Sequence, residues 1–263
     1  MTARDFEARS KRLVHIERHI DAMATNLPEL THFIETDTGD PRACLMFLGS
    51  HATANAMVAW FRHQDLTATK QWSYVAGNLT RTAYRMVSDT FSPGAKMLTL
   101  LQPLLSDNDF LLNWFANFDS AYDPRRAENH KTHDFWAYQA IIAIQGDWQR
   151  LKNRCERVLA EPPKASGEKK YLVDHQFYLA LALGDIPAME DAIRQIVAPR
   201  AVSARSNDES GFTADLISTP AVIYAKIAWR HGYHVTIDSP FLPQQWLPIA
   251  PLDSYADHYT FLA

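Results

Sequence analysis

Glycine is scarce in this sequence, with nine residues in 263. Folds rich in β-strands usually need more glycine, because their many tight turns require left-handed backbone conformations. Long apolar runs are also missing: no stretch approaches the roughly 20 residues that a membrane-spanning helix needs. The segment from Met1 to Arg12 is charged and lacks the apolar run of a signal peptide. These absences favour a helical protein of the cytoplasm with no membrane partner.

The sequence has few cysteines and a small net charge. Cys44 and Cys155 lie far apart within apolar helical patterns, so we expect buried, reduced thiols and no disulfide framework. The formal net charge is −4, which disfavours direct nucleic-acid binding because phosphate contacts depend on clustered Lys and Arg. This charge permits a basic protein partner but is too small to predict one. Hydrophobic residues, in contrast, make up 47% of the chain, enough to form a packed core.

Catalytic motifs are missing as well. The sequence has no Gly-x-Ser-x-Gly elbow, no phosphate-binding glycine loop and no dinucleotide fingerprint. His15 and His19 have the spacing of zinc-protease ligands, but no glutamate directly follows the first histidine. The cluster from His130 to Asp134 is better explained by a helix start at Thr132 than by metal binding. We therefore predict no enzymatic activity, no cofactor and no metal, with a metal-dependent helical enzyme as the weakest alternative.

Apolar residues at intervals of three or four predict several helices in the first half. The first covers about Arg4 to Ala24 and is followed by a loop. Asp40 caps the second, with Pro41 in its first turn, and its alanines indicate close approach of a neighbouring helix. Thr67 or Thr69 caps a third predicted helix, which reaches Val87. The chain restarts at Ser92-Pro93 and forms a fourth helix over Met97–Leu105. Asp107 opens a fifth helix, which covers Phe110–Phe118.

The second half repeats one helical unit. Trp136–Ile144 and Gln176–Leu183 are apolar helices, and each is followed by a Gly-Asp pair. The two pairs begin at Gly146 and Gly184, which are 38 residues apart. Glycine can end a helix by taking the left-handed conformation, and the following aspartate can cap the next helix. The repeat therefore predicts helical hairpins that stack side by side.

A third apolar helix, Ala221–Trp229, breaks this repeat. It leads into Tyr233–Asp238, which alternates like a short strand or an extended tail, and several prolines keep the remainder irregular. The whole pattern predicts an all-α fold of stacked antiparallel helix pairs, like a helical-repeat protein, with a short extended C-terminal tail. We expect a single domain over residues 1–263, with an N-terminal half of about 1–118 and a C-terminal half of about 132–263.

Two segments combine the charged and aromatic side chains that are typical of protein interfaces. The first is the predicted helix Phe110–Phe118, which is aromatic and flanked by acidic residues. The second is the polar loop Arg205–Gly211 before the last long helix. The alternatives are a helix buried in the core and a solvated loop. The candidate partner-binding residues are Asp107, Asp109, Trp114, Asp119, Asp123, Asp208 and Glu209.

The second half resembles the immunity-49 family, whose members are immunity proteins of bacterial polymorphic toxin systems. The resemblance rests on Gln145–Trp148, Leu183–Asp185 and above all the closing segment Ala228–Pro243, and it covers about Phe135 to Pro248. It implies a non-enzymatic protein that binds and blocks a cognate toxin delivered by neighbouring cells. Toxins paired with such proteins are often nucleases that act in the cytoplasm.

No motif of this family assigns contact residues, so the resemblance leaves the binding surface open. The immunity hypothesis predicts a rigid helical scaffold that occludes the active site of a toxin or locks it in an inactive form. The competing hypothesis is a helical-repeat adaptor that binds peptides in a concave groove. Exposed aromatic side chains would suit a homo-oligomer equally well.

Overall fold

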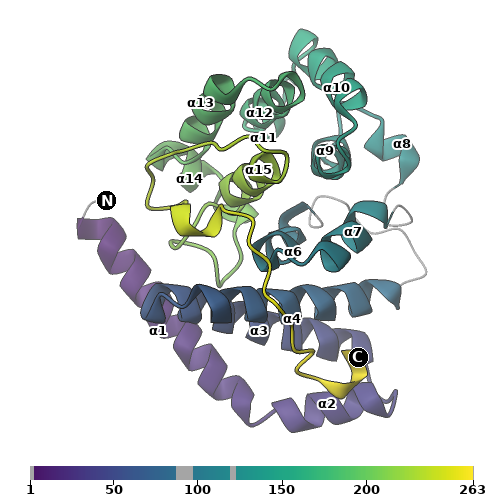
Figure 1. Ribbon diagram of the computed structural model, residues 1–263, viewed down its shortest axis with the longest axis vertical. Helices are drawn as coiled ribbons and strands as arrows, with labels where there is room; N and C mark the ends of the chain where they lie inside the picture. The colour runs from purple at the N-terminus through teal and green to yellow at the C-terminus, as the bar shows by residue number, and fades with distance from the viewer. Residues whose placement is uncertain (1–2, 87–96, 119–122, 263) are drawn as a thin grey trace.

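Helices dominate the computed structural model, which describes residues 3–86, 97–118 and 123–262 (Figure 1). Within these ranges the chain has no β-strand, and the predicted all-α fold is confirmed. The N-terminal half contains α1 (Ala3–Ala24), α2 (Leu27–Glu35), α3 (Pro41–His63), α4 (Leu66–Arg85), α6 (Leu101–Ser106) and α7 (Asp109–Asn117). The C-terminal half contains α8 (Pro124–Ala127), α9 (His133–Gln145), α10 (Trp148–Ala160), α11 (Ser166–Lys169), α12 (Leu172–Leu183), α13 (Ile186–Ile196), α14 (Pro199–Ala204) and α15 (Thr219–Arg230), and the 3-10 turns are η2 (Ser206–Asp208), η3 (Gln244–Trp246) and η4 (Thr260–Leu262).

The helices α3 and α4 form the main pair of the N-terminal half. The predicted start of α3 is confirmed, because the Asp40 carboxylate accepts a hydrogen bond of 2.9 Å from the Ala43 N–H. The predicted close approach is also present: a β-carbon on Gly49 would lie 3.9 Å from the backbone oxygen of Ala76 in α4. Small residues on α3 therefore allow the two backbones to pack closely.

Two predicted features before α4 are wrong. Residues 27–35 form α2 where a loop was expected. Pro28 fits the first turn of this helix, because N–H groups of the first turn have no hydrogen-bond acceptor within the helix and the proline therefore loses no bond. The cap of α4 is Asp65, whose carboxylate accepts a first-turn N–H, and neither Thr67 nor Thr69 has this role. Aspartate at this position satisfies a donor that the helix itself leaves free.

The segment around Asp107 also differs from the prediction. Asp107 does not open a helix; its left-handed backbone, with φ of 58°, ends α6. Asn108 caps α7 instead, and its side chain accepts a hydrogen bond of 2.8 Å from a first-turn N–H. The predicted restart at Ser92-Pro93 and the predicted helix end at Val87 lie outside the described residues.

The Gly-Asp turns of the C-terminal half are confirmed. Gly146 ends α9 and Gly184 ends α12 in left-handed conformations, with φ of 73° and 70°. Asp147 and Asp185 then cap α10 and α13 through bonds of 3.2 Å and 3.1 Å to backbone N–H groups. Thr132 caps α9, also as predicted. Because α10 packs on α12 and α12 packs on α13, the two hairpins stack.

The helix α15 ends the repeat and fills the centre of the molecule, since each residue from Thr219 to Ala228 is buried. In the described residues after Tyr233 the chain forms no strand and no α-helix, and its regular elements are the 3-10 turns η3 and η4, so the irregular C-terminal tail is present. This tail crosses the N-terminal half and reaches α2 (Figure 1). There Leu262 joins a small apolar cluster that includes Leu45 and Leu79.

A larger apolar cluster contains side chains of both halves, from Leu13 in α1 to Leu247 in the tail. Cys44 and Cys155 are buried free thiols, as predicted. Burial raises the pKa of the Cys155 thiol, which keeps this group protonated. Over the described ranges, no helix combines the length and the apolar character that crossing a membrane requires.

Candidate functional site

The structure places Asp107 in the core and not on a recognition surface. Its side chain is 0% exposed, and its two carboxylate oxygens bind Lys70 Nζ at 2.8 Å and Lys226 Nζ at 2.5 Å. The same carboxylate accepts a hydrogen bond of 3.2 Å from the Ala250 N–H in the tail. Burial lowers the pKa of Lys226 to about 8, although Asp107 attracts its ammonium group. The prediction of Asp107 as a surface contact is therefore corrected: this carboxylate bridges two buried lysine side chains.

Asp208 and Glu209 bind partners within the protein, while Ser206, Asn207, Ser210 and Gly211 of the same loop, Arg205–Gly211, are exposed. Asp208 is buried, and its oxygens accept bonds of 2.8 Å from Arg205 Nε and 2.9 Å from the Tyr171 hydroxyl. Glu209 accepts bonds of 2.7 Å and 2.6 Å from the backbone N–H and the hydroxyl of Thr219 at the start of α15. Burial raises the pKa of Glu209 to about 7. Both carboxylates thus make contacts within the fold, and both also line a cavity of about 330 Å³.

The remaining predicted contacts do not form one site. Asp109 is exposed and binds an arginine of α15. Trp114 is half-buried and stacks on Phe118 with ring centres 4.5 Å apart, while much of α7 faces the core. Asp123 caps α8 with bonds of 2.8 Å and 3.3 Å to backbone N–H groups. Asp119 lies outside the described residues.

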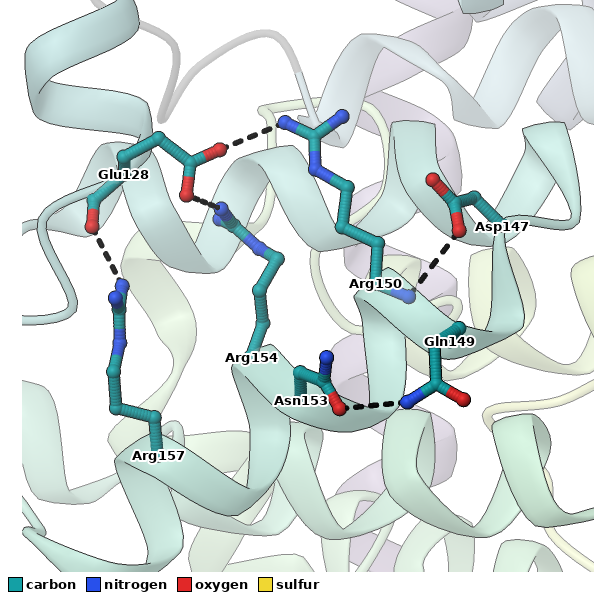
Figure 2. Close-up of a pocket in the computed structure, with 7 residues that line it drawn as sticks. All are labelled: Glu128, Asp147, Gln149, Arg150, Asn153, Arg154 and Arg157. Atoms are coloured by element: carbon teal, nitrogen blue, oxygen red, sulfur yellow. Dashed lines mark hydrogen bonds and ion pairs between the residues drawn. The ribbon is translucent and has the colours of Figure 1, made fainter.

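A cavity of about 540 Å³ opens on the polar face of α10 (Figure 2). Three arginines of this helix, at positions i, i+4 and i+7, point to the same side because helix positions with this spacing share a face. Glu128, at the end of α8, lies opposite them. The lining residues are Glu128, Asp147, Gln149, Arg150, Asn153, Arg154 and Arg157.

Glu128 bridges all three arginines (Figure 2). Its carboxylate oxygens accept bonds of 2.7 Å from Arg150 Nη2 and 2.7 Å from Arg154 Nη1. Its backbone oxygen accepts a bond of 2.6 Å from Arg157 Nη2. Partial burial opposes ionisation, but the bond from Arg150 and the nearby positive charges outweigh it and hold the pKa of Glu128 below its usual value. Glu128 is therefore ionised at neutral pH.

Arg154 is the fixed centre of this group, with a side chain only 5% exposed. Besides Glu128 it donates to Gln139 Oε1 at 2.6 Å and to the backbone oxygens of Ala127 and Phe135 at 2.7 Å and 3.2 Å. Its guanidinium lies 3.8 Å from the centre of the Phe135 ring, a cation–π contact. Burial lowers the pKa of Arg154 to about 10, which still leaves it charged at neutral pH.

Arg150 and Arg157 flank this centre and remain accessible. The Arg150 side chain is 40% exposed and lies 5.1 Å from the centre of the Tyr138 ring. Arg157 is exposed and lies 5.0 Å from the centre of the Phe135 ring. These rings of α9 limit the conformations of both arginines. The sequence prediction missed the cavity, although the spacing of the three arginines between Trp148 and Ala160 was a visible signal.

A second cavity, of about 880 Å³, lies beside the C-terminal end of α10. Glu128 of the first cavity is followed in the chain by His130 and Lys131 of the second, so the two cavities are neighbours. Together they contain six Lys and Arg side chains and four Asp and Glu side chains. We call this region the α10 edge. The residues of the second cavity are His130, Lys131, Glu161, Pro162, Pro163, Lys164, Ala165, Glu168, Lys169 and Leu172.

The chemistry of the α10 edge is that of a binding surface for carboxylates or other anions. Two accessible guanidinium groups can each bind a carboxylate through paired N–H donors. Among the lining side chains that the structure describes, none is a serine or a cysteine. Among the residues that the structure describes, no group of three or more His, Cys, Asp and Glu side chains is placed to hold a metal ion.

Comparison with known proteins gave one finding. A family model described as Immunity protein 49 matches residues 52–246, which is more than half of the chain. The matched segment begins inside α3, ends at Trp246 and includes the whole α10 edge. Searches of curated proteins and of solved structures gave no significant match.

Proposed function

The chain belongs to the immunity protein 49 family, and from this premise we propose that it binds one cognate bacterial toxin and neutralises it. The single observation that supports this proposal is the family match over residues 52–246. The toxin is proposed to be a nuclease that a neighbouring cell delivers and that acts in the cytoplasm. The immunity protein would act there as a stoichiometric inhibitor, without catalysis, by covering the active site or by locking the toxin in an inactive form.

The fold provides the rigid scaffold that such an inhibitor needs. Two buried ion clusters, around Asp107 and Asp174, connect helices of different parts of the chain. A scaffold that does not reorganise on binding loses little conformational entropy, which favours high affinity. We therefore expect tight binding to one partner, and a peptide adaptor with many weak partners is a poorer match to this architecture.

Co-expression with the toxin encoded beside this chain tests the proposed function. Cells that produce the toxin alone should stop growing, and cells that also produce this protein should recover. The purified pair should form a complex with a Kd of about 1 nM or lower, measured by calorimetry. A toxin that remains lethal although the folded protein is present would contradict the immunity function.

A nuclease assay tests the finer part of the proposal. The purified toxin should degrade DNA or RNA, and an equimolar amount of this protein should stop the reaction. A toxin that is neutralised but leaves nucleic acids intact would contradict the nuclease assignment alone, with the immunity function unaffected.

A further inference from the structure

Resting on the function proposed above, we propose that the α10 edge is the docking surface for an acidic segment of the toxin, with two carboxylates of that segment bound by Arg150 and Arg157. Both arginines line the cavity on α10 and both are accessible to a partner. The partner is thus identified by its chemistry: a stretch of toxin chain that carries Asp or Glu side chains.

The first argument is preorganisation. The buried Arg154 donates to four acceptors, one of which is Glu128, and its guanidinium stacks on the Phe135 ring. Arg154 therefore fixes the position of Glu128 and is not itself available to bind a partner. A side-chain oxygen of Glu128 accepts a hydrogen bond from Arg150 Nη2, and the backbone oxygen of Glu128 accepts one from Arg157 Nη2. A guanidinium has five N–H donors, so each of these bonds leaves further donors on its arginine. Arginines fixed in this way lose little side-chain entropy when a partner binds.

The second argument is charge. The whole chain has a formal net charge of −4. The α10 edge reverses this sign locally, because its six Lys and Arg side chains outnumber its four acidic ones. A local positive surface on a negative protein attracts a partner through its acidic face, and such charge complementarity raises the association rate and selects the partner.

The third argument is spacing. Arg150 and Arg157 are seven residues apart on α10, which corresponds to about 10 Å along the helix axis. An extended chain covers this distance in about three residues. A toxin segment in the polyproline II conformation has three residues per turn, so carboxylates three residues apart would lie on the same side, about 9 Å apart, and could reach both guanidinium groups at once. The second cavity, with Lys131, Lys164 and Lys169, continues the positive surface beyond the end of α10.

A nucleic acid suits this surface less well than an acidic protein segment. A phosphate backbone carries a charge at every nucleotide, and four acidic side chains of the α10 edge would repel it. A protein segment can instead place its carboxylates at the two arginines and neutral side chains elsewhere. Nucleic-acid binding is accordingly one of the results that would overturn the proposal.

Charge reversal tests the docking surface. The Kd for the purified toxin should weaken about tenfold or more in Arg150→Glu and in Arg157→Glu, and the loss should shrink at high salt, because exposed ionic contacts are screened. Lys152→Glu is the matched control, since Lys152 lies on α10 but does not line the cavities; its Kd should stay within about twofold. Thermal unfolding of each variant verifies the fold. Unchanged binding by both folded arginine variants would overturn the docking surface and leave the immunity function intact.

A labelled proline-rich hexapeptide with two glutamates three residues apart and neutral residues elsewhere provides a second test that needs no toxin. Its fluorescence anisotropy should rise with this protein in low salt, and the rise should be lost in Arg150→Glu and Arg157→Glu but not in Lys152→Glu. A hexathymidylate oligonucleotide is the competing probe. The proposal is overturned if this two-glutamate peptide shows no saturable binding, or if the oligonucleotide binds more tightly at the same arginines. If the toxin itself does not bind the wild-type protein, the proposed function fails, and the peptide result still decides whether the α10 edge recognises carboxylates.

Discussion

Asp107 and Asp174 are fully buried carboxylates that each connect helices distant in the sequence. Asp107 binds Lys70 of α4 and Lys226 of α15. Asp174 of α12 accepts bonds of 2.7 Å and 2.9 Å from the guanidinium of Arg205 and a further bond from Trp136 Nε1 at 3.1 Å. A buried charge is tolerated only when such partners are complete, because an unpaired one is costly to desolvate. Each carboxylate therefore specifies where several helices must meet.

Replacing Asp107 should show this cost directly. Asp107→Ala leaves the ammonium groups of Lys70 and Lys226 buried without their counter-charge, so we expect a loss of about 3–5 kcal/mol in the free energy of unfolding. Urea denaturation monitored by circular dichroism measures the change. The matched control is Asp109→Ala, since Asp109 lies nearby in the sequence but forms an exposed ion pair; its loss should be below about 1 kcal/mol. Equal losses in the two variants would contradict the role of burial.

Glu209 should make the stability depend on pH. Its pKa is raised by burial from 4.5 to about 7 in the folded protein. The folded state therefore holds the proton more strongly than the unfolded state, so the contribution of Glu209 is fully present below pH 4.5 and is lost as the pH rises to about 7. In Glu209→Gln this part of the pH dependence should disappear. Melting temperatures of both proteins between pH 4.5 and pH 8 check this, and parallel curves would contradict the raised pKa.

At the scale of elements, the helical hairpins are defined by signals only a few residues long. Gly146-Asp147 and Gly184-Asp185 each supply a left-handed helix end and the cap of the next helix. Both features depend on the local backbone, and the sequence predicts them correctly. The second glycine also packs closely, since a β-carbon on Gly184 would lie 3.3 Å from the hydroxyl of Tyr233 in the tail.

Gly184→Ala should destabilise the second hairpin. Alanine at a φ of 70° is strained by about 1–2 kcal/mol, and its β-carbon would also press on Tyr233. Gly211→Ala is the control, because no atom lies within 4 Å of a β-carbon there; it should change the free energy of unfolding by less than about 0.5 kcal/mol. Thermal or urea denaturation of the two variants measures the difference. A Gly184→Ala protein as stable as the control would show that this turn can relax.

Features that depend on distant partners could not be predicted in this way. Asp107 was interpreted as a surface acid because its partner Lys226 is 119 residues away in the sequence. The arginines of α10 repeat at helical spacing, but the site also needs Glu128, which lies between the two predicted halves of the chain. Local signals therefore located most of the longer helices but not α2, whereas the candidate site required the packing of α8 against α9 and α10.

At the scale of the whole molecule, the two halves share one core. The large apolar cluster includes residues of α1, α6, α9 and α15, and the tail packs across the N-terminal half to reach α2 and α4. The family match begins at residue 52 and ends at residue 246, so α1, α2 and the end of the tail lie outside it. These outer segments pack around α3 and α4. We propose that the chain folds as one cooperative unit.

Separating the halves tests this cooperativity. Fragments 1–118 and 132–263, expressed alone, should lack a cooperative thermal transition, because the first contains Asp107 without Lys226 and the second lacks the surface on which α15 packs. Mixing the two fragments should restore part of the helical signal and a single transition. Either fragment melting cooperatively at the temperature of the whole protein would contradict a single folding unit.

The ion cluster of Asp107 also has a consequence for the timing of protection. Ribosomes synthesise Asp107 well before Lys226 and Ala250, at about 5–20 residues per second. Until residues 226 and 250 have left the exit tunnel, the Asp107 carboxylate lacks one or both of these partners, and the first half cannot complete its native packing. Under the proposed immunity function, a molecule still on the ribosome would thus give no defence against an incoming toxin. Protection would depend on the stock of finished protein that the cell holds beforehand.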